Sequence, residues 1–161
     1  GGGPFTWTTK REERSKLWAA RHDAYWAGLA LRPGCQTFSS DVCVPISRLA
    51  ECIAETKADI EATGLVAPIV GHVGDGNFHT LPLFDPADAD EVARVKAFVG
   101  RLVERTLAME GTASGEHGVG QGKMKYLEAE HGAAALDMMA TIKRALDPKG
   151  ILNPGKIVAI R

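Results

Sequence analysis

Apolar residues recur along this chain with a helical period in some segments and as short, β-prone runs in the stretches between them. Proline and glycine mark the ends of the helical segments. Arg32-Pro33-Gly34 stops the first segment, and Gly64 and Gly111 stop the next two. The predicted helices are residues 12–31, the segment from Pro45 to Gly64, the segment led by the N-cap Asp85-Pro86 and ended by Gly111, and residues 133–146.

Two β-prone regions separate these helices. Residues 36–44 are typical of a strand, and the runs 65–70 and 78–83 flank Asp75-Gly76, the strongest short hairpin signal in a sequence. The order strand, helix, hairpin, helix predicts an α+β fold of the split β-α-β, ferredoxin-like kind. We expect an antiparallel sheet covered on one face by helices, followed by a C-terminal helical segment.

Composition narrows the class of protein without naming it. The chain has 161 residues, 45% of them hydrophobic and 24% charged, with a net charge of -1, so one domain is expected and nucleic acid is not an expected partner. No apolar run approaches the roughly 18 residues of a membrane span. Three cysteines without metal-ligand spacing indicate reduced thiols in a cytoplasmic setting. The start Gly-Gly-Gly-Pro, with no targeting pattern, suggests a fragment of a longer protein.

Two histidines bracket the predicted hairpin turn. A two-residue turn at Asp75-Gly76 would make His72 and His79 direct cross-strand neighbours, with Cβ atoms about 5 Å apart. Two imidazoles on one face of a hairpin suit a metal ion. A hydrogen-bonded pair in a polar groove explains them equally well, and the hairpin alone leaves both interpretations open.

The glycine-rich loop at residues 112–123 supplies a carboxylate that favours the metal interpretation. Its Glu116-His117 pair lies among glycines that let the backbone approach a ligand closely. The loop is not a phosphate-binding P-loop, because His117 and Met124 stand where that motif needs Gly and Ser or Thr. With His72 and His79, Glu116 makes a two-histidine, one-carboxylate set, which binds zinc, manganese or iron and leaves positions open for substrate or water.

His117 has a different expected role from its neighbour. If the loop is extended, its side chain points away from that of Glu116. It is then free to act as a general acid or base beside the metal. The alternatives are a hydrogen bond to one of the ligands, or a solvated surface histidine.

Three motifs, at residues 71–79, 114–120 and 152–156, together resemble the C-terminal half of FAD-linked 2-hydroxyacid dehydrogenases of the vanillyl-alcohol-oxidase superfamily. Segments 17–22 and 41–49 are most similar to the cytochrome-linked members that oxidise D-lactate. The resemblance covers nearly the whole chain in order. It implies that residues 1–161 form the α+β cap over the isoalloxazine ring, and that an N-terminal domain of the same polypeptide, absent here, holds the FAD.

The resemblance also implies roles for single residues. The two-histidine, one-carboxylate set would hold a divalent metal, zinc or manganese, and His117 would be the proton acceptor. Arg21 would bind the substrate carboxylate; the alternative is an internal ion pair with an acidic residue such as Asp41. Asn153 and Lys156 would lie near the flavin. A cytochrome or quinone would accept the electrons, which extends the expected location to the periphery of an energy-transducing membrane.

Two positions bear on the substrate. Relatives that oxidise D-2-hydroxyglutarate have a lysine and an asparagine where this chain has Ser39 and Leu81, so a second buried carboxylate would lack a partner here. A short D-2-hydroxy acid such as D-lactate is therefore expected, with glycolate next. Two other classes stay open: a free-standing metal hydrolase, because the same ligands can activate water, and a non-catalytic metal-binding or interaction module.

Overall fold

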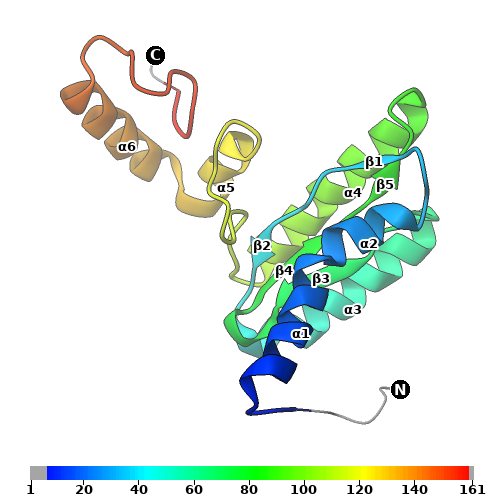
Figure 1. The fold of residues 1–161 in the computed structure, drawn as a ribbon. Helices are drawn as coiled ribbons and strands as arrows, with labels where there is room; N and C mark the ends of the chain where they lie inside the picture. Colours follow the sequence, from blue (N-terminus) through cyan, green and yellow to red (C-terminus); the bar gives the residue numbers. More distant parts are fainter. Residues whose placement is uncertain (1–6, 160–161) are drawn as a thin grey trace.

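The structure, a computed structural model, describes residues 7–159 and has an α+β fold, as predicted (Figure 1). The helices are α1 (Arg11–His22), α2 (Ala24–Ala30), α3 (Ile46–Thr63), α4 (Ala89–Ala108), α5 (Leu127–His131) and α6 (Ala133–Leu146). The strands are β1 (Gln36–Thr37), β2 (Val42–Cys43), β3 (Ile69–His72), β4 (Asn77–Thr80) and β5 (Leu83–Phe84). The described residues also form the 3₁₀ turns η1 (Val73–Asp75) and η2 (Met124–Tyr126).

An antiparallel sheet of order β2-β4-β3 forms the centre of the fold, and β1 pairs with β5 in a smaller sheet. Helices α3 and α4 pack on the face of the central sheet that carries Phe78. The buried apolar cluster there consists of Val42, Val44, Leu49, Cys52, Phe78, Leu102, Val103, Met109 and Ala113. Burial of this cluster is the main force that holds helices and sheet together.

Helices lie on both faces of the sheet (Figure 1), whereas the sequence predicted helices on one face only. The predicted helix 12–31 is also wrong in its continuity, because it is divided into α1 and α2 at Asp23. Aspartate favours turns over helix interiors, which explains a break at this position. Gly28 then lets α2 approach the sheet, since a Cβ atom there would lie 3.0 Å from Leu81 Cδ1. Much of the predicted apolar face stays exposed, including Leu17 and Leu31.

The hairpin forms, but the predicted register is wrong. His79 lies opposite Val70 and not opposite His72, a shift of two residues. The cause is a longer connection, in which the 3₁₀ turn η1 and a left-handed Gly76 (φ 74°) replace the predicted two-residue turn. Because side chains alternate along a strand, a shift of two residues leaves each on the same face. His72 and His79 therefore remain on one face, as diagonal neighbours.

The predicted strand 36–44 is also divided, and this division positions the site. Its first part, β1, pairs with β5, and its second part, β2, pairs with β4. A strand cannot follow both partners without a break, because β4 and β5 are separated by Leu81-Pro82 and belong to different sheets. The irregular segment between β1 and β2 contains Ser40 and Asp41, both buried.

Two helix details correct the sequence analysis. The N-cap of α4 is Asp88, whose side chain accepts hydrogen bonds from the backbone of Asp90 and Glu91; the predicted cap, Asp85, instead stabilises the preceding turn through the backbone N–H of Ala87. Helix α6 has the predicted bounds. Its apolar residues Ile142 and Leu146 stay exposed, because α6 lies away from the central sheet (Figure 1). Among residues 7–159, no helix is both long and apolar enough to cross a membrane.

An ion-pair cluster joins α3 to α4 and gives a first testable prediction. The Arg101 guanidinium lowers the pKa of Asp59, burial opposes this, and Arg105 adds to the lowering. We expect Asp59→Asn to reduce the free energy of unfolding by about 1.5–3 kcal/mol at pH 7, the usual value of hydrogen bonds to a charged group. A lowered folded-state pKa stabilises above the unfolded value of about 3.9, and this contribution is lost as the pH falls through the folded-state pKa.

Urea unfolding at pH 7 and in a series of buffers below pH 4 tests this prediction. The difference between wild type and Asp59→Asn should shrink with falling pH. Asp137→Asn, an exposed position on α6, is the control. A difference that does not change with pH would show that the charge of Asp59 contributes nothing to stability.

Candidate metal and substrate site

The candidate site lies on the face of the central sheet opposite α3 and α4. His72 ends β3 and His79 lies in β4, and their rings are 6.2 Å apart between centroids and nearly perpendicular. His79 is buried, whereas His72 is partly exposed at the end of its strand. The Glu116 carboxylate reaches the same point from the glycine-rich loop. The two-histidine, one-carboxylate set of the sequence analysis is thus assembled in space.

The distances within this set match the spacing of metal ligands. Glu116 Oε1 lies 3.0 Å from His79 Nε2 and 3.4 Å from His72 Nε2, and one ligand atom of each residue lies within 4.8 Å of the others. Bonds of 2.0–2.1 Å around a tetrahedral zinc ion place neighbouring ligand atoms about 3.3 Å apart. The set can therefore enclose a metal ion with little rearrangement.

The orientation of His79 supports a cation at this point. Its Nδ1 donates a hydrogen bond to the carbonyl oxygen of Ser40 (3.0 Å), so the Nε2 atom of a neutral ring carries a lone pair. That lone pair faces the Glu116 carboxylate oxygen 3.0 Å away. Two acceptors at this distance repel each other unless a cation lies between them, either a metal ion or a second proton on the ring. A carbonyl that orients the far side of a histidine is a common companion of metal ligands.

A buried aspartate fixes the loop that carries Glu116. Asp41 accepts hydrogen bonds from the backbone N–H groups of Glu116 (3.0 Å) and His117 (3.0 Å) and from the ammonium of Lys123 (2.9 Å). Burial alone would raise the pKa of Asp41, but these donors and Asn77 together hold it far below its usual value. Asp41 is therefore ionised at neutral pH and is a fixed negative charge under the loop.

Arg21 reaches the site from α1. Its Nη2 donates a hydrogen bond to His72 Nε2 (3.1 Å), and the side chain of Asp41 is engaged by Lys123, so the alternative of an Arg21–Asp41 ion pair is wrong. Beside this contact lies a cavity of about 310 Å³, lined by Arg14, Leu17, Trp18, Arg21, Gly71 and His72. A guanidinium at the border of a cavity can bind a carboxylate through two parallel hydrogen bonds.

His117 does not point away from its neighbour. Its Nε2 lies 3.5 Å from Glu116 Oε1, and its ring centroid is 5.6 Å from that of His79. The expectation of opposite directions required an extended loop, but the backbone bends through residues 115–117. His117 is the most exposed member of the group, with 66% of its side chain accessible. It is therefore open to a ligand from solvent and close to the candidate metal position.

Asn153 and Lys156 are not part of this group. Both are exposed in the C-terminal segment, where Asn153 has a positive φ of 44°. The same segment meets the glycine-rich loop through the backbone, since the N–H of Ile157 donates to the carbonyl of Gly120 (2.8 Å). The suggested contact of these two residues with a flavin stays a prediction.

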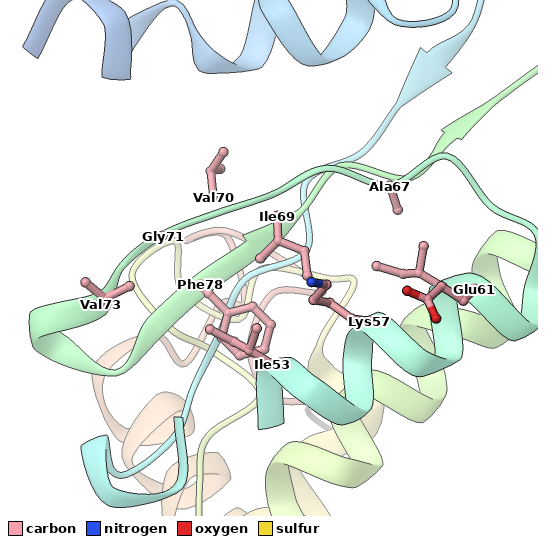
Figure 2. Close-up of a pocket in the computed structure, with 10 residues that line it drawn as sticks. Ile53, Lys57, Glu61, Ala67, Ile69, Val70, Gly71, Val73 and Phe78 are labelled. Carbon is pink, nitrogen blue, oxygen red and sulfur yellow. The ribbon is translucent and has the colours of Figure 1, made fainter. Parts of the chain in front are cut away.

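A second, larger cavity lies elsewhere. It measures about 500 Å³ and lies between α3 and the edge strand β3, on the sheet face opposite the histidines. Figure 2 shows Ile53 and Lys57 of α3 below it, and Val70 on the other side of the strand, pointing toward α1 and α2. Its walls are mostly apolar, and it lacks the convergent histidines and carboxylate that mark the candidate site.

Sequence reasoning missed the residues that orient the ligands. Nothing in the sequence pointed to Ser40 or Lys123 as orienting residues, and Asp41 entered only as an alternative partner for Arg21. A polar residue beside a β-prone run is a weak signal by itself. It becomes informative only when the run is known to pair with the strand that carries His79.

Comparison with known proteins gives the class to which this fold and site belong. Residues 1–157 match the family described as FAD linked oxidases, C-terminal domain. The chain belongs to this family.

Relatives within the family carry names that agree with the motifs. The chain is 54% identical over 160 residues to "Probable D-lactate dehydrogenase, mitochondrial" of Danio rerio, covering 99% of this chain and 32% of the relative. It is 44% identical to "D-lactate dehydrogenase [cytochrome], mitochondrial" of Arabidopsis thaliana, covering 98% and 28%. "Glycolate oxidase subunit GlcD" of Bacillus subtilis is 36% identical, covering 92% and 31%. The chain thus spans about a third of the length of these relatives.

A solved structure supports the fold. The chain aligns with "4-ethylphenol oxidase from Gulosibacter chungangensis: isoeugenol complex" at a TM-score of 0.63 and 22% identity, covering 94% of this chain and 31% of the other. At this identity the likeness concerns the fold alone. It agrees with the arrangement of helices around small antiparallel sheets described above.

Proposed function

We propose that this chain forms the metal- and substrate-binding part of an FAD-dependent dehydrogenase that oxidises a small D-2-hydroxy acid, D-lactate to pyruvate. The observation that carries the proposal is the convergence of His72, His79 and Glu116, whose ligand atoms lie within 4.8 Å of one another beside Arg21. The flavin would be held mainly by an N-terminal domain of the same polypeptide. Asn153 and Lys156 would approach it from the C-terminal segment.

The absent groups would supply the steps that side chains cannot perform. When bound, a divalent metal, zinc or manganese, acts as a Lewis acid toward a hydroxyl group, and FAD accepts a hydride. A metal at His72 Nε2 would replace Arg21 as the partner of that nitrogen. The Arg21 guanidinium is then free to bind the carboxylate of the acid, which fixes the orientation of the α-carbon.

We assign to His117 the role of accepting the proton of the substrate hydroxyl. A 2-hydroxy acid held by Arg21 would present its hydroxyl toward the ligand set, because the guanidinium and the ligands adjoin the same side of the sheet. His117 Nε2 lies 3.5 Å from Glu116 Oε1, so it is near this hydroxyl and can accept its proton as the C–H bond breaks. The exposed ring can pass the proton on to solvent.

The proposed size of the substrate rests on Leu81 and Ser39, the two positions at which relatives that oxidise D-2-hydroxyglutarate have an asparagine and a lysine. Leu81 is buried against α2, and Ser39 donates a hydrogen bond to the neighbouring carbonyl of Ser40. Neither offers a charge to a second carboxylate, whose burial without a partner costs several kcal/mol. We therefore favour D-lactate over a dicarboxylic acid as the substrate, with glycolate as the next candidate. Membership of the FAD linked oxidases favours this function over the metal hydrolase.

Arg21→Lys in the full-length protein tests the proposed substrate. Lysine keeps the charge but lacks the planar pair of N–H groups, so we expect kcat/KM for D-lactate to fall about tenfold or more. Arg11→Lys, at the exposed start of α1, is the matched control and should keep the wild-type value. Steady-state assays with D-lactate, glycolate and D-2-hydroxyglutarate provide the measurement. Unchanged kinetics in Arg21→Lys, or a preference for D-2-hydroxyglutarate, would contradict the proposal.

A further inference from the structure

Ser40 and Asp41 lie in the irregular segment between β1 and β2. They contact β4, which carries His79, and the glycine-rich loop, which carries Glu116. The carbonyl of Ser40 accepts from His79 Nδ1 on β4 (3.0 Å), and the Asp41 carboxylate accepts from the backbone of the glycine-rich loop. Both residues are at least 95% buried. Two adjacent residues thus orient a histidine on one element and a carboxylate on another.

We propose that Asp41 and Lys123 form a positioning pair. The pair holds Glu116 and His117 in place for the metal and the substrate, and it touches neither the metal nor the substrate itself. The inference rests on the proposed function, because it assigns the pair a purpose in metal binding. Glu116 N–H lies 3.0 Å and 3.1 Å from the two Asp41 oxygens, and His117 N–H lies 3.0 Å from one of them. The direction of both side chains follows from where these N–H groups are held.

Lys123 closes the loop on the same aspartate. Its Nζ donates to the Asp41 carboxylate (2.9 Å) and to the Asp41 backbone carbonyl (2.7 Å). The two ends of the segment 116–123 are therefore fastened to one residue in another element. Charge-assisted hydrogen bonds of this kind are shorter and stronger than neutral ones, so the pair can hold a loop rich in glycine in one conformation.

Gly115 shows how closely the loop must approach. A Cβ atom at this position would lie 2.2 Å from Asp41 Oδ1 and 2.1 Å from Asn77 Nδ2. Any side chain would push the loop away from the carboxylate. Gly122, in the same loop, has open space around its Cβ position. Close packing against Asp41 therefore requires glycine at position 115 but not at position 122.

The chain contains a matched pair that contacts none of the candidate metal ligands. Lys143 and Asp147 have the same side-chain exposures as Lys123 and Asp41, 22% and 3%, and a 2.6 Å contact. Asp147 also accepts two backbone N–H groups, from Ile151 and Leu152. Asp147→Asn therefore reproduces the loss of a buried, loop-capping carboxylate far from the candidate metal ligands.

The experiment compares Asp41→Asn with Asp147→Asn in the full-length protein. Co²⁺ is the probe, followed by its visible absorption, and hydrogen exchange of the peptide 112–120 reports the loop. We expect Asp41→Asn to weaken Co²⁺ binding by about 10- to 100-fold, the usual effect of removing a partner that orients a ligand, and to accelerate exchange in this peptide. Asp147→Asn should lower the melting temperature but should leave both Co²⁺ binding and hydrogen exchange in this peptide unchanged.

Each other outcome decides against the proposal. Wild-type Co²⁺ affinity in a folded Asp41→Asn protein overturns it, whether or not exchange changes. If Asp41→Asn does not fold, Gly115→Ala and Gly122→Ala take its place: Gly115→Ala alone should weaken Co²⁺ binding, and equal affinities overturn the proposal. If the wild-type protein takes up no Co²⁺, the proposed metal site itself fails, and the positioning role fails with it.

Discussion

His117→Ala is expected to slow reduction of the flavin by D-lactate in the full-length protein by about 10²- to 10⁴-fold, the usual contribution of a positioned general base. Metal and flavin content should stay at the wild-type level, because His117 is beside the ligand set and not part of it. The measurement is anaerobic stopped-flow absorbance of the flavin, together with metal analysis. The pH profile of kcat/KM should lose the limb that reports the proton acceptor.

The chain offers a matched control for this substitution. His131 on α5 lies 3.5 Å from an adjacent glutamate, Glu130, as His117 lies 3.5 Å from Glu116. His131→Ala should leave the rate of flavin reduction unchanged. Loss of metal in His117→Ala would contradict the assignment and make His117 a ligand. An unchanged rate would contradict it in a different way, because another group would then take the proton.

Glu116→Ala is expected to abolish turnover at ambient metal concentration. The carboxylate approaches both histidines, at 3.0 Å and 3.4 Å, so its loss would leave two of the three proposed ligands. Affinity for Mn²⁺ or Zn²⁺ should fall by more than the roughly 10- to 100-fold that is typical for removal of a partner outside the ligand set. Excess metal should restore part of the activity, since the two histidines remain.

Metal titration followed by turnover assays tests this prediction. Glu128→Ala, at an exposed position of α5, is the control and should bind metal as the wild-type protein does. Full metal content with normal kinetics in Glu116→Ala would show that the carboxylate is not a ligand. Full metal content with slow turnover would instead make Glu116 the candidate base.

The hairpin shows how far the sequence could lead. Its turn residues predicted a hairpin, and the parity of strand positions predicted that His72 and His79 share a face. The register was wrong because a 3₁₀ turn lengthened the connection, which short-range turn preferences do not resolve. The prediction that His72 and His79 share a face is correct because the register differs from the predicted one by an even number of residues. A shift of one residue would have separated the two histidines.

The remaining differences have a common physical origin. The division of strand 36–44 between two sheets depends on which strands pair, and pairing is a long-range property that local preferences do not contain. The role of Asp41 is also a long-range property, because its carboxylate accepts from four groups distant in sequence. These groups belong to Asn77, Glu116, His117 and Lys123. The exposed apolar faces of α1 and α6 show that a helical stripe predicts a helix more reliably than it predicts what covers the stripe.

Anomalous diffraction from crystals of the full-length protein grown with Mn²⁺ tests the metal site most directly. We expect one anomalous peak within about 2.3 Å of the Nε2 atoms of His72 and His79 and of the Glu116 carboxylate. The hydrogen bond from His79 Nδ1 to the Ser40 carbonyl should be kept. No peak at this position under saturating Mn²⁺, with both histidines hydrogen-bonded to Glu116 instead, would contradict the proposed metal site.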